Sequence, residues 1–208
     1  MRKDYVGIID YGMSNILSVR NAVEYLGYKT KVLQEAVEIS KSQILILPGV
    51  GSFKEAMLNL KNSGIDKSIL EAVLEKNVKI LGICLGMQIL SKSSTENGYS
   101  KGLELIPFET KGFHEISGFS KKIPHIGFDQ IVTNSDSILF SKIKNYSDFY
   151  FLHSYYLSQT EQHELTSICE YGVKIVAAYE KNNICAVQFH PEKSQQNGLK
   201  LLENFLKF

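Results

Sequence analysis

The first half of the chain alternates short apolar runs with longer segments whose apolar residues recur at helical spacing. Continuous apolar runs are typical of parallel strands that are buried on both faces, and the segments between them are typical of helices that cover a sheet. The predicted strands are 6–9, 29–33, 44–47 and 78–83, and the predicted helices are 15–26, 52–60 and 66–76. This order predicts an α/β fold in which helices flank a mainly parallel central sheet.

The second half is richer in strand-forming residues, so we expect the sheet to be mixed. The predicted elements are strands 126–133, 149–152, 165–170, 175–179 and 184–189, and a last helix over 197–206. Residues 111–122 are predicted to form a loose, exposed loop. The 208 residues contain no repeat, low-complexity tract or clear linker. We therefore expect a single domain over 1–208.

Composition argues against several classes of function. A formal net charge of +1 gives no electrostatic basis for binding nucleic acid or an anionic membrane. The longest mostly apolar run, residues 80–90, is interrupted by glycines and is too short to span a membrane. Cys84, Cys169 and Cys185 are an odd number of cysteines, at spacings that indicate no disulfide framework. We therefore expect a cytoplasmic protein with free thiols.

One of these thiols is predicted to lie at a sharp corner of the chain. Cys84 is the centre of Gly-Ile-Cys-Leu-Gly at 82–86, between the predicted strand 78–83 and a short, helix-like apolar segment. This is the thiol form of a nucleophile elbow, in which the glycines allow a tight turn and the close approach of a substrate. The helix that follows favours the reactive thiolate. The alternative is a buried cysteine in a core strand.

A cysteine nucleophile needs a base, and the base needs a group that orients it. The best candidates are His190 and Glu192, in Gln-Phe-His-Pro-Glu at 188–192. The proline biases His190 toward an extended conformation, in which residues two apart point to the same side. Glu192 can then bind one ring nitrogen and leave the other facing Cys84. The alternative is a structural histidine, with His153 as the second choice of base.

A third element is the turn Leu-Pro-Gly-Val-Gly-Ser at 47–52, which follows a predicted buried strand. Its exposed backbone N–H groups could stabilise a tetrahedral oxyanion, an effect worth about 3 kcal/mol per donor. The alternative is a plain strand-to-helix turn. Histidine, cysteine and acidic residues show no metal-ligand spacing anywhere in the sequence, so we expect no metal.

These segments together resemble the class I, or triad, glutamine amidotransferases. The resemblance rests on the segments 48–51, 82–88 and 188–194, with support from 8–13, 124–127 and 149–155. It covers essentially the whole chain. Within the family, Met87 and the sequence Pro-Gly-Val-Gly are similar to the glutaminase subunits of imidazole glycerol phosphate synthases, which act in histidine biosynthesis. The resemblance implies the α/β fold of that family with a cysteine nucleophile elbow, and we expect no cofactor.

The resemblance also implies a mechanism. Cys84 attacks the side-chain amide of glutamine while the backbone N–H groups of Val50 and Leu85 hold the oxyanion. His190, oriented by Glu192, protonates the leaving ammonia. Water then hydrolyses the γ-glutamyl thioester to glutamate.

Substrate and partner contacts are implied in the same way. The residues expected to bind glutamine are Gly49, Gly51, Gln88, Glu96, Ser154 and Tyr155. A carboxylate at Glu96 suits the α-ammonium group of glutamine, and the alternative is a solvated loop residue. Ammonia must be passed on without escaping into water, so the resemblance implies a heterodimer with a (β/α)8 cyclase subunit. Asn15 and Lys193 are expected to face that partner.

Three residues depart from the family pattern, namely Ser14 in place of glycine, Phe128 in place of tryptophan and Asp129 in place of asparagine. They lie in segments expected near the partner. An alternative hypothesis is therefore a paralogue that supplies ammonia to a cyclase-like partner for an amidino-sugar of a surface polysaccharide. A non-catalytic scaffold and a cysteine peptidase or hydrolase are further alternatives, which the intact triad and Leu85 respectively disfavour.

Overall fold

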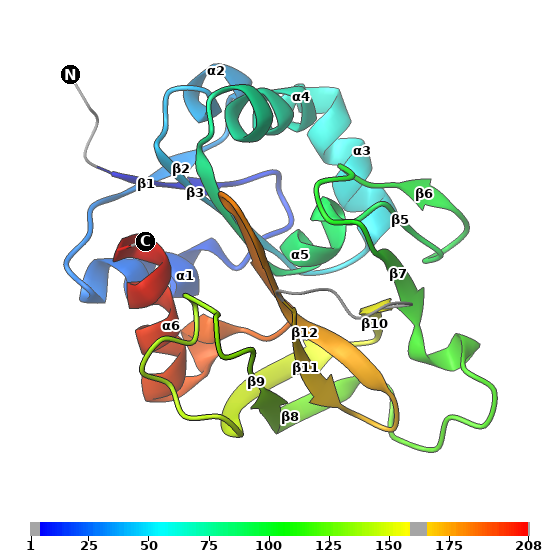
Figure 1. Ribbon diagram of the computed structural model, residues 1–208. Coiled ribbons are helices and arrows are strands. Elements are labelled where there is room, and N and C mark those ends of the chain that lie inside the picture. Colours follow the sequence, from blue (N-terminus) through cyan, green and yellow to red (C-terminus); the bar gives the residue numbers. More distant parts are fainter. Residues whose placement is uncertain (1–4, 159–165, 208) are drawn as a thin grey trace.

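A computed structural model describes residues 5–158 and 166–207 of the chain. Its centre is a nine-stranded sheet in the order β2-β1-β3-β4-β13-β12-β11-β8-β9 (Figure 1). The strands are β1 (Val6–Ile9), β2 (Thr30–Leu33), β3 (Ile44–Gly49), β4 (Lys79–Cys84), β8 (His125–Val132), β9 (Ser147–His153), β11 (Thr166–Glu170), β12 (Lys174–Lys181) and β13 (Ile184–Val187). The first residue of the predicted strand 165–170 lies outside the described residues.

The sheet has a parallel half and an antiparallel half. β1 pairs in parallel with β2 and β3, β3 pairs in parallel with β4, and β4 pairs in parallel with β13. Beyond β13 the pairings with β12, β11, β8 and β9 are antiparallel. The predicted mixed sheet is therefore confirmed, with the parallel strands coming mainly from the first half of the chain.

Helices cover both faces of this sheet (Figure 1). They are α1 (Ile16–Tyr25), α2 (Ala36–Ile39), α3 (Phe53–Ser63), α4 (Ile65–Leu70), α5 (Leu85–Leu90) and α6 (Gln195–Lys207). Short turns of other helix types are the π-helical η1 (Glu71–Glu75) and the 3-10 turns η2 (Phe113–Glu115) and η3 (Pro191–Lys193). The predicted helix 66–76 is thus α4 continued by η1, and Gly64, with a φ of 69°, separates it from α3.

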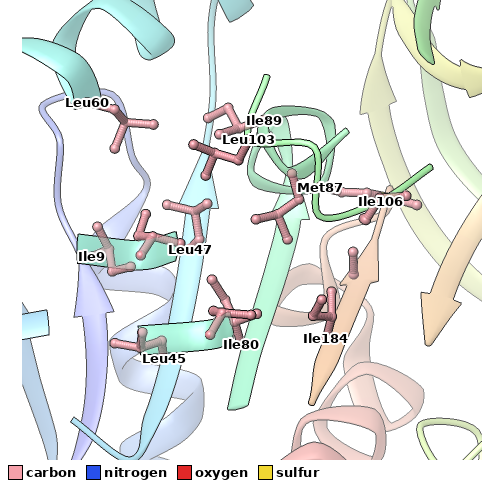
Figure 2. Packing of buried hydrophobic residues seen from close by; sticks show 14 of the residues in the cluster. Ile9, Leu45, Leu47, Leu60, Ile80, Met87, Ile89, Leu103, Ile106 and Ile184 are labelled. Atoms are coloured by element: carbon pink, nitrogen blue, oxygen red, sulfur yellow. The ribbon is translucent and has the colours of Figure 1, made fainter. Parts of the chain in front are cut away.

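Successive residues of the parallel strands enter two different cores, because side chains alternate between the faces of a sheet. Ile9, Leu45 and Ile80 pack with α3, α4 and α5 on one face, and Figure 2 shows Ile9 beside Leu47 in this cluster. The neighbours of these three in sequence, residues 8, 46 and 81, pack with α1 and α6 on the other face. Burial on both faces explains why these strands carry continuous apolar runs.

A second, four-stranded sheet lies beside the carboxyl end of α5 and was not predicted. Its order is β10-β7-β5-β6, with strands Tyr155–Ser158, Glu109–Gly112, Ser93–Ser94 and Ser100–Lys101. The prediction of a loose loop over 111–122 is partly wrong, because this segment begins within β7 and continues into η2. Phe113 is fully buried and stacks on Tyr156, with ring centroids 4.7 Å apart.

In the described part of the chain, no helix combines the length and apolar character that a membrane span requires.

Candidate active site

Cys84 occupies the corner at which β4 ends and α5 begins. Its φ of 54° is in the left-handed region, which residues other than glycine rarely adopt. The corner is tight: a Cβ added to Gly86 would lie 1.8 Å from the carbonyl oxygen of Leu47. The glycines of the pentapeptide therefore let α5 pack directly on β3, and the strained corner places the Cys84 side chain in a cavity.

His190 and Glu192 lie next to Cys84 because β13 runs parallel to β4 and the chain then turns into η3. Glu192 Oε1 is 2.8 Å from His190 Nδ1, and the exposed fractions of the two side chains are 1% and 2%. His190 Nε2 is buried and has no hydrogen-bond partner within the described residues. One ring nitrogen is thus held by the carboxylate and the other is left for the thiol, as the spacing of the two residues predicted.

The charges around His190 favour its protonated form. Burial by itself lowers the pKa of a histidine, but the interactions with Cys84 and Glu192 outweigh burial and raise the pKa of His190 to about 10. At neutral pH the ring is therefore an imidazolium between a sulfur atom and a carboxylate. Such a ring can stabilise a thiolate and can later donate a proton.

The cavity at Cys84 has a volume of about 310 Å³. Its lining residues are Val50, Gly51, Cys84, Leu85, Gln88, Glu96, Pro124, Leu152, His153, Ser154 and Tyr155. The structure thus brings together the nucleophile, both predicted oxyanion donors and most of the predicted glutamine-binding residues. His190, Glu192 and Gly49 are not among the lining residues. Gly49 is buried, and a Cβ added to it would lie 2.1 Å from the hydroxyl of Tyr11.

The two predicted oxyanion donors differ in the hydrogen bonds of their backbone N–H groups. Leu85 is the first residue of α5, where backbone N–H groups have no partner within the helix. The N–H of Val50, in contrast, donates to the carbonyl oxygen of Met13 at 2.9 Å. Ser14 holds the same segment, because its hydroxyl donates to the carbonyl oxygen of Pro48 at 3.0 Å. In this structure the Val50 amide is therefore engaged by the loop after β1.

Gln88 is anchored at the base of the cavity. Its amide nitrogen donates to the carbonyl oxygen of Tyr155 at 2.8 Å and to Gln188 Oε1 at 3.1 Å. Both N–H groups are thereby used, so the amide oxygen of Gln88 is the atom left for a ligand. Gln188 in turn donates to Cys84 Sγ at 3.7 Å. Sequence analysis missed Gln188, although it precedes His190 by two residues and therefore points to the same side.

Glu96 lies across the cavity from the thiol, on the loop between β5 and β6. Its Oε2 accepts the backbone N–H of Phe53, the first residue of α3, at 2.7 Å. The carboxylate thus completes the amino end of that helix, which Ser52 leaves without a side-chain cap. A carboxylate has further lone pairs, so Glu96 can cap the helix and still bind a cation in the cavity.

Asn15 and Lys193 lie outside the cavity. Asn15 Oδ1 accepts a hydrogen bond from the hydroxyl of Ser18 at the start of α1. Lys193 is exposed, and its Nζ lies 5.8 Å from the centre of the Tyr150 ring. Asn15 is thus half-buried and Lys193 exposed, and neither is among the residues that line the cavity.

The fold also assembles a cluster that sequence spacing did not suggest. Ligand atoms of His125, Asp129 and Cys169 lie within 4.8 Å of one another. Burial raises the pKa of the Cys169 thiol to about 12, which disfavours the thiolate that a metal needs. His125 Nε2 is already 2.9 Å from Asp129 Oδ2. These groups fit a hydrogen-bonded pair better than a metal site.

Comparison with known proteins agrees with this geometry. The family model for class-I glutamine amidotransferases matches residues 7–208. Two solved structures superpose with TM-scores of 0.74 at 16% identity, a glutamine amidotransferase (97% of each chain) and PurLQS from Thermotoga maritima (99% of this chain, 98% of that one). The chain therefore belongs to the class-I glutamine amidotransferase family and is an enzyme of that class.

Curated proteins with higher sequence identity are similar to this chain over nearly its full length. The chain is 44% identical over 205 residues to imidazole glycerol phosphate synthase subunit HisH 1 of Parasynechococcus marenigrum, covering 98% of this chain and 97% of the relative. It is 44% identical over 200 residues to the HisH subunit of Moorella thermoacetica, covering 96% and 93%. A HisH subunit of Chlorobaculum tepidum is 42% identical over 204 residues.

Proposed function

We propose that this chain is the glutaminase subunit of an imidazole glycerol phosphate synthase. It hydrolyses glutamine to glutamate and ammonia, and it passes the ammonia to a (β/α)8 cyclase subunit in histidine biosynthesis. The observation that carries the proposal is the buried Cys84–His190–Glu192 arrangement at a cavity, in a chain that matches HisH subunits over nearly its full length. We further propose that residues 1–208 form one amidotransferase domain that works in the cytoplasm.

Cys84, His190 and Glu192 have separate roles in the proposed hydrolysis of glutamine. The Cys84 thiolate attacks the side-chain carbonyl carbon of glutamine, and the His190 imidazolium donates its proton to the leaving ammonia. The raised pKa of His190 supports this role, because the ring carries the proton before the substrate binds. Water, deprotonated by the now neutral His190, then cleaves the γ-glutamyl thioester and returns the thiolate. Glu192 keeps the ring oriented and stabilises its charge.

The cavity suits the amino-acid end of glutamine. The carboxylate of Glu96 and the amide oxygen of Gln88 are both acceptors, and an α-ammonium group is a donor of three hydrogen bonds. Main-chain groups of Gly51, Ser154 and Tyr155 line the same cavity and would bind the rest of the amino-acid end.

One step is needed before the oxyanion can be held. The N–H of Val50 has to leave the carbonyl of Met13, to which it donates in this structure. Until it does so, Leu85 alone offers a donor, and the tetrahedral intermediate lacks about 3 kcal/mol of stabilisation. We therefore expect a low glutaminase rate for the isolated chain and activation upon docking of the cyclase with its acceptor.

An exposed apolar surface beside the cavity supports docking of a partner. Ile126, Phe128 and Leu152 are 56%, 48% and 37% exposed, and they come from the paired strands β8 and β9. Leu152 also lines the cavity, so the surface formed by these three residues, the β8–β9 patch, adjoins the site. β9 is the edge strand of the large sheet. A cyclase seated on the patch would cover the cavity and receive ammonia without its release into water.

The test is to purify the chain with a histidine-pathway cyclase and to measure glutamine-dependent formation of imidazole glycerol phosphate. Phe128→Glu should weaken the complex at least about tenfold, because a charge would be buried in an apolar interface. The matched control is Leu74→Glu, since Leu74 is 65% exposed on η1, outside the patch. Absence of a glutamine-dependent product, with co-purification of a different cyclase-like protein, would overturn the proposal in favour of a paralogous pathway. Phe128 itself, a departure from the family pattern on the patch, is the observation that favours that alternative.

A further inference from the structure

A continuous row of hydrogen bonds runs from the surface of β8 to the wall of the cavity. Asp129 Oδ2 is 2.9 Å from His125 Nε2, and His125 Nδ1 is 3.1 Å from His153 Nε2. His153 Nδ1 is 2.8 Å from the carbonyl oxygen of Tyr155. Both rings are buried, with exposed fractions of 1% and 6%, whereas the Asp129 side chain is 41% exposed. The row therefore joins a solvent-accessible carboxylate to the main chain that lines the cavity.

The position of each proton in this row follows from its partners. A carbonyl oxygen only accepts, so His153 Nδ1 carries a hydrogen. Full burial lowers the pKa of His153 to about 3, and the ring is therefore neutral with a bare Nε2. His125 Nδ1 must then donate to it. The other ring nitrogen, His125 Nε2, faces the Asp129 carboxylate, which only accepts hydrogen bonds. A neutral ring whose hydrogen is on Nδ1 has none left for this contact, so the His125–Asp129 pair needs one more proton.

The surroundings of His125 accommodate that proton as an imidazolium. The ring lies between the rings of Phe151 and Tyr171, with centroid distances of 4.6 and 3.8 Å and interplanar angles of 15° and 14°. Aromatic faces on both sides attract a positive ring, and the Asp129 carboxylate neutralises it. Among the described residues, the titratable groups that face His125 are Asp129, His153, Tyr171 and Cys169.

The same carbonyl continues the row to the thiol. Tyr155 O also accepts from Gln88, Gln88 donates to Gln188, and Gln188 donates to Cys84 Sγ. Gln88 therefore donates in both directions, to the Tyr155 carbonyl and to Gln188, and the N–H that Gln188 donates to the sulfur favours a thiolate. Displacement of His153 would therefore shift the Tyr155 main chain and the Gln88 amide, the groups assigned above to glutamine binding.

We propose that Asp129 and His125 are positioning residues for glutamine binding: the proton that they share fixes the tautomer of His153 and thereby holds the Tyr155 carbonyl and Gln88 in the cavity wall. This inference rests on the proposed glutaminase function. Burial lowers the pKa of His125 below its ordinary value, and the Asp129 carboxylate only partly opposes that effect. The row is consequently intact while the pair keeps its proton and is disrupted as the pH rises and the proton is lost.

Two substitutions of Asp129 separate this role from a merely structural one. In Asp129→Asn the side-chain NH2 can donate to a neutral His125 Nε2, so every hydrogen bond of the row is satisfied without the extra proton. In Asp129→Leu the ring has no partner and loses its orientation. Asp136→Leu, at an exposed acidic residue in the turn that follows the same strand, is the matched control.

The first readout is labelling of Cys84 by a glutamine-analogue electrophile, with the full chain bound to its cyclase partner, between pH 5 and 8. The parent should need about tenfold more reagent for half-maximal rate at the high end, since one charge-assisted hydrogen bond is lost. Asp129→Asn should show a flat dependence, and Asp129→Leu should need about tenfold more at every pH. Reagent requirements of both variants equal to those of the parent at all pH values would overturn the inference.

The second readout does not depend on activity. Nitrogen-15 spectra of the histidine rings should show His153 as the Nδ1–H tautomer and His125 with both nitrogens protonated at pH 5, and Asp129→Asn should leave His125 neutral. A neutral His125 in the parent at that pH would overturn the inference. If Cys84 of the parent takes no label although these spectra are as expected, the proposed glutaminase function fails while the hydrogen-bonded row stands.

Discussion

The groups on the two sides of the Cys84 thiol differ in how far they are arranged for the proposed reaction. On one side, His190 and Glu192 are buried with Nδ1 and Oε1 2.8 Å apart, and the pKa of His190 is raised to about 10. On the other side, the Val50 amide donates to Met13, and the Ser14 hydroxyl fixes the carbonyl of Pro48. The proton-transfer side is therefore assembled, whereas half of the oxyanion side is engaged elsewhere.

The difference follows from how each side is built. His190 and Glu192 follow a strand in the middle of the large sheet, where core packing fixes the backbone. Residues 48–51 form a turn at the end of β3, and a loop on the protein surface competes for the backbone groups of that turn. A single hydrogen bond contributes about 1 kcal/mol net, so a docked partner can redirect this turn but not the buried pair. We infer that such an arrangement would restrain glutamine hydrolysis until the partner is in place.

The most damaging change to the assembled side is Cys84→Ala. Glutamine-dependent synthesis by the complex should fall by at least about 10⁴-fold, because no other group forms the thioester. Synthesis from added ammonium salt should be unaffected, since the partner carries out that step. Assays with glutamine and with ammonia distinguish these outcomes, and loss of both activities would mean that Cys84 is mainly structural.

Glu192→Gln keeps the shape of the pair and removes its charge. The rate of hydrolysis should fall roughly 10³-fold, because the ring loses its orientation and its imidazolium is less stable. The pKa of His190 should fall from about 10, which ring spectra can follow.

Stability should change with pH in a defined direction. The pKa of His190 is raised from 6.5, so its protonation stabilises the folded state fully below about pH 6.5 and this contribution is lost as the pH rises toward 10. The unfolding free energy of Glu192→Gln should therefore vary less over this range than that of the parent. An equally steep dependence in both proteins would contradict the charge assignment.

The oxyanion side is tested by Val50→Pro, which removes the backbone N–H. Hydrolysis in the complex should fall about 10²–10³-fold, the effect of losing one oxyanion donor. Val50→Ala retains the N–H and trims a side chain that is 40% exposed, so it is the control and should stay near the parent rate. The ring spectrum of His190 should be the same in both variants. Equal rates for the proline and alanine variants would show that this amide plays no part in catalysis.

The smallest expected effect concerns the hydrogen bond by which Ser14 holds the turn over 48–51. Ser14→Ala removes the hydrogen bond to Pro48 and should raise the partner-independent glutaminase rate up to about fivefold, the equivalent of roughly 1 kcal/mol. Ser18→Ala, which removes a hydroxyl contact with Asn15 on the nearby helix, is the control. A rate for Ser14→Ala that is no higher than that of the control would show that the hydroxyl does not restrain the turn.

Local patterns were sufficient to place the candidate reacting groups. The glycines around Cys84, the two-residue spacing of His190 and Glu192, and the apolar runs of the parallel strands each express a short-range rule of backbone geometry. These rules predicted the elbow, the oriented base and the core strands. The predicted loop over 111–122 was partly wrong because pairing of β7 with β10, a contact distant in sequence, decides that segment.

The sequence by itself thus determined the α/β fold and the nature of the reacting groups, because both depend on residue type and spacing. Only the tertiary structure decided that the Val50 amide faces Met13, that Gln88 offers an oxygen to the cavity, and that Asp129 is linked to Tyr155 through two histidines. Each of these depends on which donor meets which acceptor across the sheet. Hydrogen bonds between residues far apart in sequence leave no periodic pattern from which they could be predicted.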